Sequence, residues 1–309
     1  MNFQQMRIVR ETVRRNFNLT QVAEALYTSQ SGVSKHIRDL EEELGVELFV
    51  RRGKRLLGLT DPGRELVPIV ERLLLDASNI KRLGEHYAKR DEGELVVATT
   101  HTQARYSLPP VVAAFKASFP KVHLLLHQGS PNEVVAMLMA GEADVGVATE
   151  ALADEPDIAS FPFYSWHHAC VVPQDHPLAG SQSQRQPLTL QALVRHPIVT
   201  YHHGFVGRAR IDQAFQEAGL QPDIVLSALD TDVIKTYVEL GLGVGIIAPI
   251  GFAPERDRGL TLLPADHLFA QSTTRIGVRK GHYLRDFAVR FICQCVPSLR
   301  DADVRAANG

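Results

Sequence analysis

The sequence predicts a small all-α N-terminal domain followed by a larger α/β domain of two lobes, and three observations support this prediction. Apolar residues recur at helical spacing through the first 90 residues, whereas strand-like and helix-like segments alternate from residue 92 onward. The chain has 309 residues, 45% of them hydrophobic, which is enough for more than one core. Charge is also divided, because residues 1–90 carry 16 Lys and Arg against 12 Asp and Glu, whereas residues 91–309 carry 17 against 23.

This division of charge leaves a nucleic-acid partner open. The net charge of -2 would argue against one if it were evenly spread, but the first 90 residues have a net charge of +4 and the rest -6. The N-terminus does not resemble a secretory signal and no run of 18 apolar residues occurs, so we expect a cytoplasmic protein without a membrane span. Three cysteines are too few for a disulfide framework or a four-ligand zinc site.

Three helices are predicted in the first 45 residues. Apolar spacing predicts a helix over residues 3–17, which Asn18 ends. Thr20 is the predicted N-cap of a short helix over residues 21–26. Ser29 is the predicted N-cap of a third helix over residues 30–44, and Gly45 is its predicted C-cap.

The last two of these helices form a pattern that is typical of DNA binding. Two short helices joined by a tight turn, the second with hydroxyl, amide and basic groups on its free face, predict a helix-turn-helix that enters the major groove. Such side chains read base edges there, and neighbouring hydroxyls hold phosphates. The predicted contacts are Thr28, Ser29, Gln30, Ser31, Ser34, Lys35 and Arg38.

A basic hairpin, or wing, is predicted directly after the third helix. Two short strands over residues 46–50 and 56–60 flank a loop that carries Arg51, Arg52, Lys54 and Arg55. These cations are expected to contact the phosphate backbone, adding salt-dependent affinity and little sequence discrimination. The alternative is a loop that is merely solvated.

A long helix is predicted over residues 62–88, with Asp61 as its N-cap and Pro62 at its first position. Its apolar residues follow a seven-residue period: Leu66, Leu73, Ile80 and Tyr87, with Val70, Ala77 and Gly84 offset by four. We therefore expect a dimer across this seam; the alternative is packing against the chain's own C-terminal domain. The predicted domains are residues 1–60, a linker and dimerisation helix over 61–90, and residues 91–309.

The C-terminal part alternates between the two kinds of element. Strands are predicted over residues 95–100, 122–127, 143–149, 169–173, 198–201, 224–228 and 245–248, and helices over 102–118, 131–140, 207–218 and 231–240. This alternation predicts mostly parallel sheets covered by helices, arranged in two lobes with a ligand-binding cleft between them.

Polar residues lie where successive strands of the first lobe end. They are Thr100, Thr102, Gln103, Ser130 and Thr149. Because such ends face one crevice, their hydroxyls and the N–H groups of helix N-termini favour a small anion. The alternative is that these residues only cap helices. Trp166 is a further candidate for the cleft lining, with a buried structural role as its alternative.

Two sets of motifs carry a family resemblance. The N-terminal residues are Ala23, Ser29, Gln30, Ser31, Ser34, Ile37, Leu40, Glu41, Leu44, Gly45, Leu48, Phe49, Arg51, Thr60 and Gly63. They are similar to the pattern of LysR-type transcriptional regulators. Four further strings, ATTHTQARY at residues 98–106, HQGSP at 127–131, ATEAL at 148–152 and DVIKTYV at 232–238, resemble the CysB group of that family, which regulates sulfur assimilation.

The resemblance implies a transcription factor rather than an enzyme, with an effector domain like a periplasmic binding protein. It implies a homo-oligomer, dimer or tetramer, that binds pseudo-palindromic sites in double-stranded DNA, with RNA polymerase as a further partner. The implied effectors are sulfate, thiosulfate, acetylserine and adenosine phosphosulfate. The residues carried over by motif are Thr100, Thr102, Gln103 and Thr149, and the predicted set is completed by Ser130, Trp166, Thr200 and Val206. No cofactor and no metal is expected.

One position departs from the group. Its usual Gly-Phe-Thr-Gly-Arg, whose threonine contacts the effector, is here Gly-Phe-Val-Gly-Arg, with Val206 in place of the threonine. His202 and His203 precede this string, where the group has other residues. Because a lost hydrogen bond costs about 0.5 to 1.5 kcal/mol, the effector is expected to differ or to bind more weakly.

Other function classes fit less well. The glycine-rich string at residues 241–245 is followed by Ile246 and leads into a strand, unlike a dinucleotide-binding loop. The adjacent pairs at 167–168 and 202–203 place two histidines on opposite faces of a strand, unlike a metal site. The predicted helix-turn-helix argues against a transport-type binding protein. A LysR-type regulator of an unrelated pathway remains the alternative.

Overall fold

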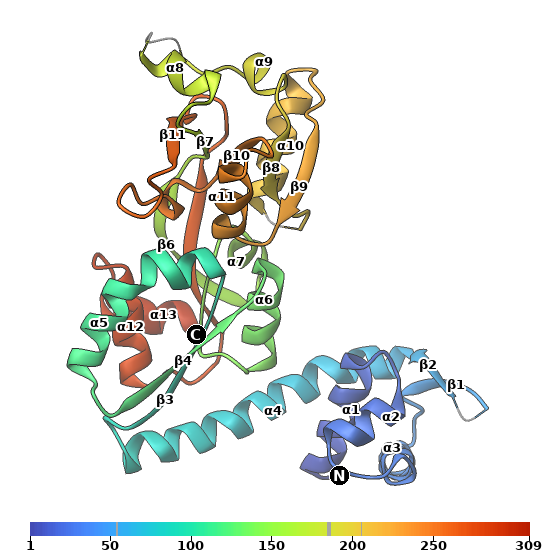
Figure 1. Ribbon diagram of the computed structural model, residues 1–309. Helices are drawn as coiled ribbons and strands as arrows, with labels where there is room; N and C mark the ends of the chain where they lie inside the picture. The colour runs from blue at the N-terminus through green and yellow to red at the C-terminus, as the bar shows by residue number, and fades with distance from the viewer. Residues whose placement is uncertain (54, 184–186, 205) are drawn as a thin grey trace. The chain divides into compact units, whose positions relative to one another are not determined.

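The computed structural model describes residues 1–53, 55–183, 187–204 and 206–309, while the side chains of residues 181–183 and 206 lie outside this description. The chain divides into two compact units, Met1–Ala88 and Lys89–Gly309 (Figure 1). None of the helices in the described residues combines the length and the apolarity that crossing a membrane requires.

The N-terminal unit begins with three short helices, α1 (Phe3–Arg14), α2 (Leu19–Ala25) and α3 (Gln30–Leu44). α3 has the predicted bounds and caps. Ser29 Oγ accepts a hydrogen bond from the Gly32 N–H at 3.1 Å, and Gly45 ends the helix in the left-handed conformation, with φ of 70°.

The first two helices differ from the prediction at their ends. α1 stops before residue 17 because Asn16 and Phe17 both have positive φ angles, which a continuing helix does not allow. The N-cap of α2 is Asn18, whose side chain accepts hydrogen bonds from the backbone of Thr20 and Gln21. The prediction of Thr20 as the cap was wrong, because the amide oxygen of Asn18 already occupies that role.

A two-stranded hairpin, β1 (Phe49–Arg52) and β2 (Arg55–Leu59), follows α3 and leads into the long helix α4 (Asp61–Ala88). The expected N-cap of α4 was also wrong by one residue. Asp61 is the first helical residue, and Thr60 Oγ1 accepts the hydrogen bond from the Gly63 N–H at 3.1 Å.

The helices and the hairpin enclose one core. Val70 and Leu74 of α4 are buried in it, together with Ile8, Val22, Val33, Ile37, Leu40, Leu48 and Phe49. Farther along α4, Ile80 is 72% exposed and Tyr87 is 82% exposed. The first part of the predicted seam therefore packs within the unit, and only the later part is free; the dimer stays a prediction.

The first lobe of the C-terminal unit is a five-stranded sheet in the order β4-β3-β5-β12-β6. Its strands are β3 (Gly93–Thr99), β4 (Val122–Gln128), β5 (Val145–Ala148), β6 (Ile158–Trp166) and β12 (Ser272–Arg279). The helical segments of this lobe are η1 (Gln103–Ser107), α5 (Leu108–Ser118), α6 (Pro131–Ala140), α7 (Ala151–Asp154), α12 (Asp286–Cys295) and α13 (Asp301–Asn308).

The second lobe is a five-stranded sheet in the order β11-β7-β10-β8-β9. Its strands are β7 (Ala169–Pro173), β8 (Ile198–Tyr201), β9 (Ile224–Ala228), β10 (Val244–Ile247) and β11 (Leu260–Pro264). Its helical segments are α8 (Pro177–Ser183), α9 (Leu190–Leu193), α10 (Val206–Glu217), α11 (Thr231–Glu239) and η2 (Pro249–Gly251).

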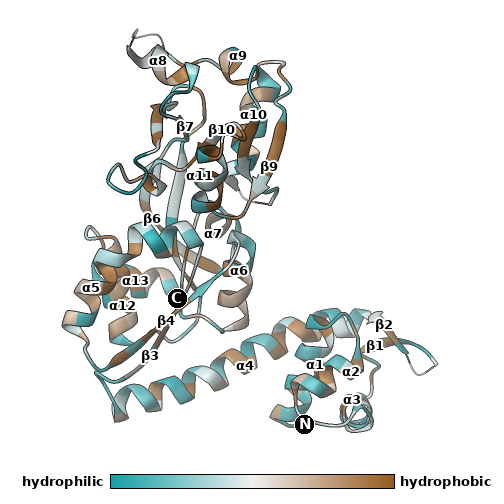
Figure 2. Ribbon diagram, in the orientation of Figure 1, coloured by the Kyte–Doolittle hydropathy of each residue, from teal (hydrophilic) through white to brown (hydrophobic). Residues whose placement is uncertain are grey.

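Each sheet has one strand that runs against the other four, β12 in the first lobe and β7 in the second. The chain passes between the lobes twice, from β6 to β7 and from β11 to β12. Hydrophobic residues concentrate along the central strands (Figure 2). The predicted fold class is thus confirmed, although β6, β11 and β12 were not predicted.

Candidate functional site

The free face of α3 presents the polar residues that the sequence singled out. Gln30, Ser31 and Lys35 are exposed, and the Ser29 and Ser31 hydroxyls lie 3.1 Å apart at the start of the helix. One surface hollow brings together Leu19, Gln30, Ser31, Ser34, Arg38, Arg51 and Gly53. The structure thus joins the helix and the hairpin into one basic and hydroxyl-rich face.

Glu41 fixes the hairpin to α3. This carboxylate is only 8% exposed, and it accepts hydrogen bonds from the backbone of Leu48 at 2.9 Å and Phe49 at 3.2 Å. It also pairs with the guanidinium of Arg51 at 2.5 Å. The charge of Arg51 is therefore partly balanced by Glu41, although its side chain is 26% exposed and lines the hollow, and its predicted phosphate contact stays a prediction.

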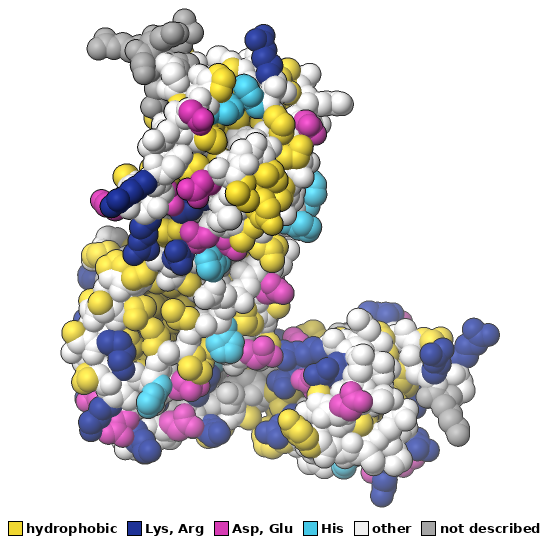
Figure 3. Space-filling view, in the orientation of Figure 1, with side chains coloured by type: hydrophobic (Ala, Val, Ile, Leu, Met, Phe, Trp, Pro, Cys, Tyr) yellow, Lys and Arg dark blue, Asp and Glu magenta, His cyan; other side chains and the backbone are white. Residues whose placement is uncertain are grey.

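The other predicted hairpin cations have different surroundings. Arg52 and Arg55 are exposed, and Lys and Arg side chains project from the tip of the hairpin in Figure 3. Lys54 lies outside the described residues. Thr28, in the turn before α3, is exposed, and its hydroxyl faces the same first turn as Ser29.

In the C-terminal unit a pocket lies between the two lobes. It is lined by Thr100, Thr102, Gln103, Pro131, Thr149, Trp166, Tyr201, Gly207, Leu229 and Ala248. Five of these are predicted site residues, namely Thr100, Thr102, Gln103, Thr149 and Trp166. None of these lining residues carries a charge, so a ligand here would meet hydroxyls, an amide, an indole and backbone N–H groups.

Gln103 and Trp166 are held in place by a buried network. The Gln103 side-chain oxygen accepts hydrogen bonds from Tyr164 at 2.8 Å and from Ser107 at 2.7 Å. The Trp166 indole N–H donates to the Thr274 hydroxyl at 3.1 Å. Burial raises the pKa of Tyr164, which therefore stays a neutral donor.

A chain of hydroxyls connects the two lobes along the lining of the pocket. Thr102 Oγ1 lies 3.4 Å from Thr231 Oγ1, which lies 2.8 Å from the Tyr201 hydroxyl. The Ala248 N–H donates to that same hydroxyl at 2.9 Å. Burial raises the pKa of Tyr201 to about 12.

Several pocket residues of the first lobe lie at the start of a helix whose first turns include a π-helical segment. After β3 the chain turns at Thr100 and enters η1 (Gln103–Ser107), a π-helical turn that leads into α5. π-helical turns are rare in proteins as a whole, and those that occur are often found at functional sites. The N–H groups in the first turn of a helix have no hydrogen-bond partner within that helix. This start of a helix, rather than a cation, is the natural place for an anion.

Three predicted site residues do not line this pocket. Ser130 caps α6 and lies in a second hollow with His101, Gln128, His202 and His203. Thr200 is buried in β8 and donates to the Ile246 carbonyl at 3.1 Å. The side chain of Val206 lies outside the description, although its neighbour Gly207 is a lining residue.

Sequence reasoning missed part of the lining. Tyr201, Leu229 and Ala248 belong to the second lobe, and no motif marks them as ligand contacts. Two of them directly follow strands, β9 for Leu229 and β10 for Ala248, and Tyr201 ends β8. The strand-end rule that found the first-lobe residues could therefore have found these as well.

His168 stands behind the pocket lining. Its ring is 1% exposed and packs against Trp166 at 4.9 Å and Phe269 at 5.6 Å between ring centroids. Burial, together with the charges of Arg210 and His167, lowers the pKa of His168 to about 3. Its neighbour His167 instead bonds the Phe269 carbonyl at 3.0 Å.

Two family models match the chain. Residues 3–64 match "Bacterial regulatory helix-turn-helix protein, lysR family", and residues 88–299 match "LysR substrate binding domain".

The chain is also similar to individual proteins over nearly its whole length. It is 57% identical over 304 residues to the HTH-type transcriptional regulator SsuR of Burkholderia cenocepacia, covering 98% of this chain and 97% of that protein. It is 54% identical over 299 residues to the HTH-type transcriptional regulator CysB of the same organism, covering 97% of this chain and 94% of that protein. Among solved structures, the cofactor-binding domain of the Cbl transcriptional regulator is 46% identical with a TM-score of 0.66, covering 70% of this chain and 92% of that one.

Proposed function

The chain belongs to the LysR family of bacterial helix-turn-helix transcriptional regulators, and from this premise we propose that it controls sulfur-assimilation or sulfonate genes in response to a small oxyanion. The observation that carries the proposal is the uncharged pocket between the lobes, where hydroxyls and an amide surround the start of η1. Such a site binds an anion by many hydrogen bonds rather than by an opposite charge.

The chemistry of the lining suits a ligand group that presents several acceptor oxygens. Thr100, Thr102 and Thr149 offer hydroxyl donors, whereas the side-chain oxygen of Gln103 accepts two hydrogen bonds and its amide nitrogen donates to the Thr274 hydroxyl at 3.5 Å. Sulfate, and the sulfate-like group of adenosine phosphosulfate, are acceptor-only tetrahedra that suit such donors. The carboxylate of acetylserine presents the same kind of acceptor atoms.

Calorimetry on the full chain with sulfate, acetylserine and adenosine phosphosulfate tests the pocket. Thr102→Val keeps the shape of the side chain and removes one donor, so the affinity for the true effector should fall about tenfold. Thr261→Val, on β11 and away from the pocket lining, is the matched control and should bind like the wild type. Undiminished binding by Thr102→Val would place the ligand elsewhere, and no heat with any of the three would reject the effector class.

Val206 is the position where this chain is expected to differ from the CysB group. Restoring the hydroxyl with Val206→Thr should tighten sulfate binding severalfold, because the threonine usual at this position in the CysB group contacts the effector. Equal affinity for sulfate in both proteins would show that position 206 does not contribute to this ligand.

The N-terminal unit supplies the DNA-binding half of the proposal. Gln30, Ser31 and Ser34 on α3 are proposed to read base edges, while Arg52 and Arg55 contact phosphates. Two such units in a homo-oligomer would read a pseudo-palindromic promoter site, with the two half-sites spaced by the protein's symmetry.

A further inference from the structure

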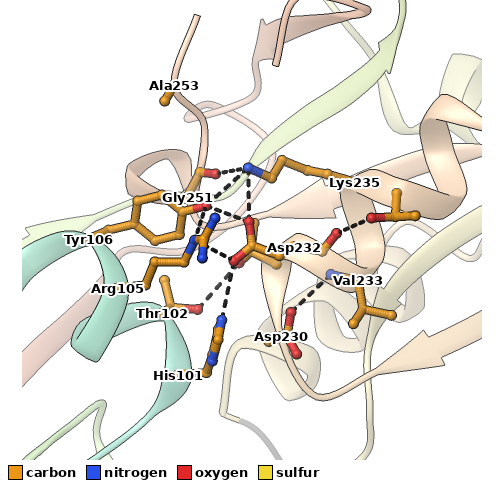
Figure 4. Close-up of polar contacts among 12 residues, drawn as sticks. His101, Thr102, Arg105, Tyr106, Asp230, Asp232, Val233, Lys235, Gly251 and Ala253 are labelled. Atoms are coloured by element: carbon orange, nitrogen blue, oxygen red, sulfur yellow. Dashed lines mark hydrogen bonds and ion pairs between the residues drawn. The ribbon is translucent and has the colours of Figure 1, made fainter. Parts of the chain in front are cut away.

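One carboxylate in the second lobe is held by side chains from the first. Asp232, in the first turn of α11, accepts a hydrogen bond from the Tyr106 hydroxyl at 2.6 Å and pairs with Arg105 Nε at 3.0 Å. His101 Nε2 lies 3.2 Å from the same carboxylate. These three partners come from residues 101–106, and Figure 4 shows them converging on Asp232. We call Asp232 with these partners the interlobe clasp.

The second lobe anchors this clasp from behind. Lys235 is 6% exposed and lies 3.3 Å from Asp232, while it donates to the Tyr106 hydroxyl at 3.1 Å. Its ammonium group also donates to the Gly251 carbonyl at 2.6 Å and to both oxygens of Asp257 at 2.9 Å. Because Lys235 is held by these neighbours, the second-lobe side of the clasp is fixed, whereas the Arg105 side chain on the first-lobe side is 46% exposed.

The carboxylate of Asp232 is ionised in this arrangement. Burial alone would raise its pKa, but the hydrogen bond from Tyr106 and the charge of Lys235 outweigh burial and hold the pKa below the usual value. A metal ion is the other occupant that the residue types suggest, since ligand atoms of His101, Asp230 and Asp232 lie within 4.8 Å of one another. The cationic groups of Arg105 and Lys235 on the same carboxylate disfavour a further cation.

The clasp is continuous with the pocket on both sides. The segment that supplies His101, Arg105 and Tyr106 also supplies Thr102 and Gln103 to the pocket lining. On the second lobe, Asp232 follows Thr231, whose hydroxyl faces Thr102 at 3.4 Å. Separating the lobes at the pocket therefore has to break the clasp, and closing them restores it.

We propose that Asp232 is a positioning residue for the effector, which holds the two lobes closed around the pocket and thereby slows effector release without touching the effector. The inference rests on the proposed function for the identity of the ligand. It predicts that loss of the clasp changes the dissociation rate more than the association rate, because the contacts exist in the closed state and are absent while the ligand enters.

The test compares full-length wild type with Asp232→Asn and with Asp286→Asn as a matched control. Asp286 also pairs with arginines, Arg90 at 3.3 Å and Arg305 at 2.5 Å, but Arg90 precedes β3 and the other two belong to the first lobe, so neither pair joins the lobes. Stopped-flow measurement with sulfate should show dissociation about tenfold faster in Asp232→Asn, the size expected for a lost charge-assisted hydrogen bond, with association changed little. Asp286→Asn should match the wild type in both rates.

Hydrogen exchange without any ligand separates this inference from the proposed function. In Asp232→Asn the amides of residues 101–107 and of the first turn of α11 should exchange faster than in wild type, while those of α12 should not. Tyr106→Phe removes one partner and keeps the charge, so it should show a smaller effect in the same direction. A wild type that binds no sulfate would count against the effector class, yet faster exchange would still support the clasp. Wild-type exchange and a wild-type sulfate dissociation rate in Asp232→Asn would overturn it.

Discussion

Arg51 and Arg52 are neighbours on the hairpin with opposite surroundings. Arg51 is paired with the buried Glu41, whereas Arg52 is exposed. Arg52→Ala should therefore reduce the slope of log affinity against log salt by about 1, because one phosphate contact is lost. Fluorescence anisotropy with a promoter fragment over a salt series measures this slope.

Arg51→Ala should act on the fold instead. Removing the partner of a carboxylate that is 8% exposed should lower the free energy of unfolding by roughly 2 kcal/mol, with little change in the salt slope. Denaturant titration gives the first quantity and the same anisotropy series the second. The reverse pattern, a flatter slope for Arg51→Ala and an unchanged one for Arg52→Ala, would exclude this assignment of the two arginines.

His168 gives the C-terminal unit a dependence on pH. The folded ring resists protonation until about pH 3, whereas the unfolded chain takes up the proton near pH 6.5. Because the unfolded state then binds more protons, stability is full above pH 6.5 and falls as the pH drops below it. Acidification from pH 7.5 to 5.5 should therefore lower the free energy of unfolding by about 1 kcal/mol through His168.

His168→Phe keeps an aromatic ring of similar size and cannot titrate. Urea unfolding at the two pH values should show that the variant loses less stability on acidification than the wild type, by about that amount. His202→Gln, at an exposed histidine, is the control and should keep the wild-type dependence. An identical loss in His168→Phe and wild type would mean that the ring is not the group responsible.

At the scale of elements, the helix α4 combines two roles along its length. Val70 and Leu74 complete the core of the N-terminal unit, while Ile80 and Tyr87 remain exposed at the later positions of the heptad. Exposed apolar residues at this spacing are typical of a helix–helix seam. The free part of the seam is therefore where a second chain would pack.

Charge placed in that seam should separate the chains. Ile80→Asp is expected to weaken dimerisation at least tenfold, because a carboxylate would be buried against an apolar partner. Sedimentation velocity over a concentration series reports the change, and Ser78→Asp, exposed on the same helix but off the seam, should behave like the wild type. If both variants dimerise equally, the interface lies on another element.

Most elements whose ends are set by local sequence signals were predicted well. Strands that depend on pairing with distant parts of the chain were predicted poorly. Ser29 and Gly45 mark the ends of α3, and Ser130 begins α6 where the sequence placed it, because caps act within one turn of the chain. The strand β12 was missed because its partners β5 and β6 are distant in sequence, and pairing rather than local pattern makes it a strand.

The residues of the pocket and of the DNA-binding face show the same difference between local and long-range signals. Strand ends and family motifs located Thr100, Thr102, Gln103 and Thr149, which depend on the topology of one lobe. The clasp at Asp232 and the partnership of Glu41 with Arg51 join residues far apart in the chain. No spacing rule connects such residues, so only the folded structure assigns them.

At the scale of the whole molecule, the charge division between the two parts matches two tasks. The net charge of +4 on residues 1–90 accompanies the helix-turn-helix, while the net charge of -6 on the rest accompanies a sensor domain. An acidic sensor can still take an anion, because the pocket relies on hydroxyls and the start of a helix. If one N-terminal unit with a net charge of +4 binds DNA weakly, pairing two units in the predicted homo-oligomer would raise the affinity for the promoter.

We propose that an oxyanion in the interlobe pocket controls promoter binding. The most direct measurement is anisotropy of a labelled promoter fragment with the full chain, with and without sulfate, acetylserine or adenosine phosphosulfate. Wild type should change its affinity for the fragment with one of these effectors, while Thr102→Val should bind DNA normally and respond only at about tenfold higher effector concentration. An equal response from Thr102→Val at every concentration would show that the effector does not act through this pocket.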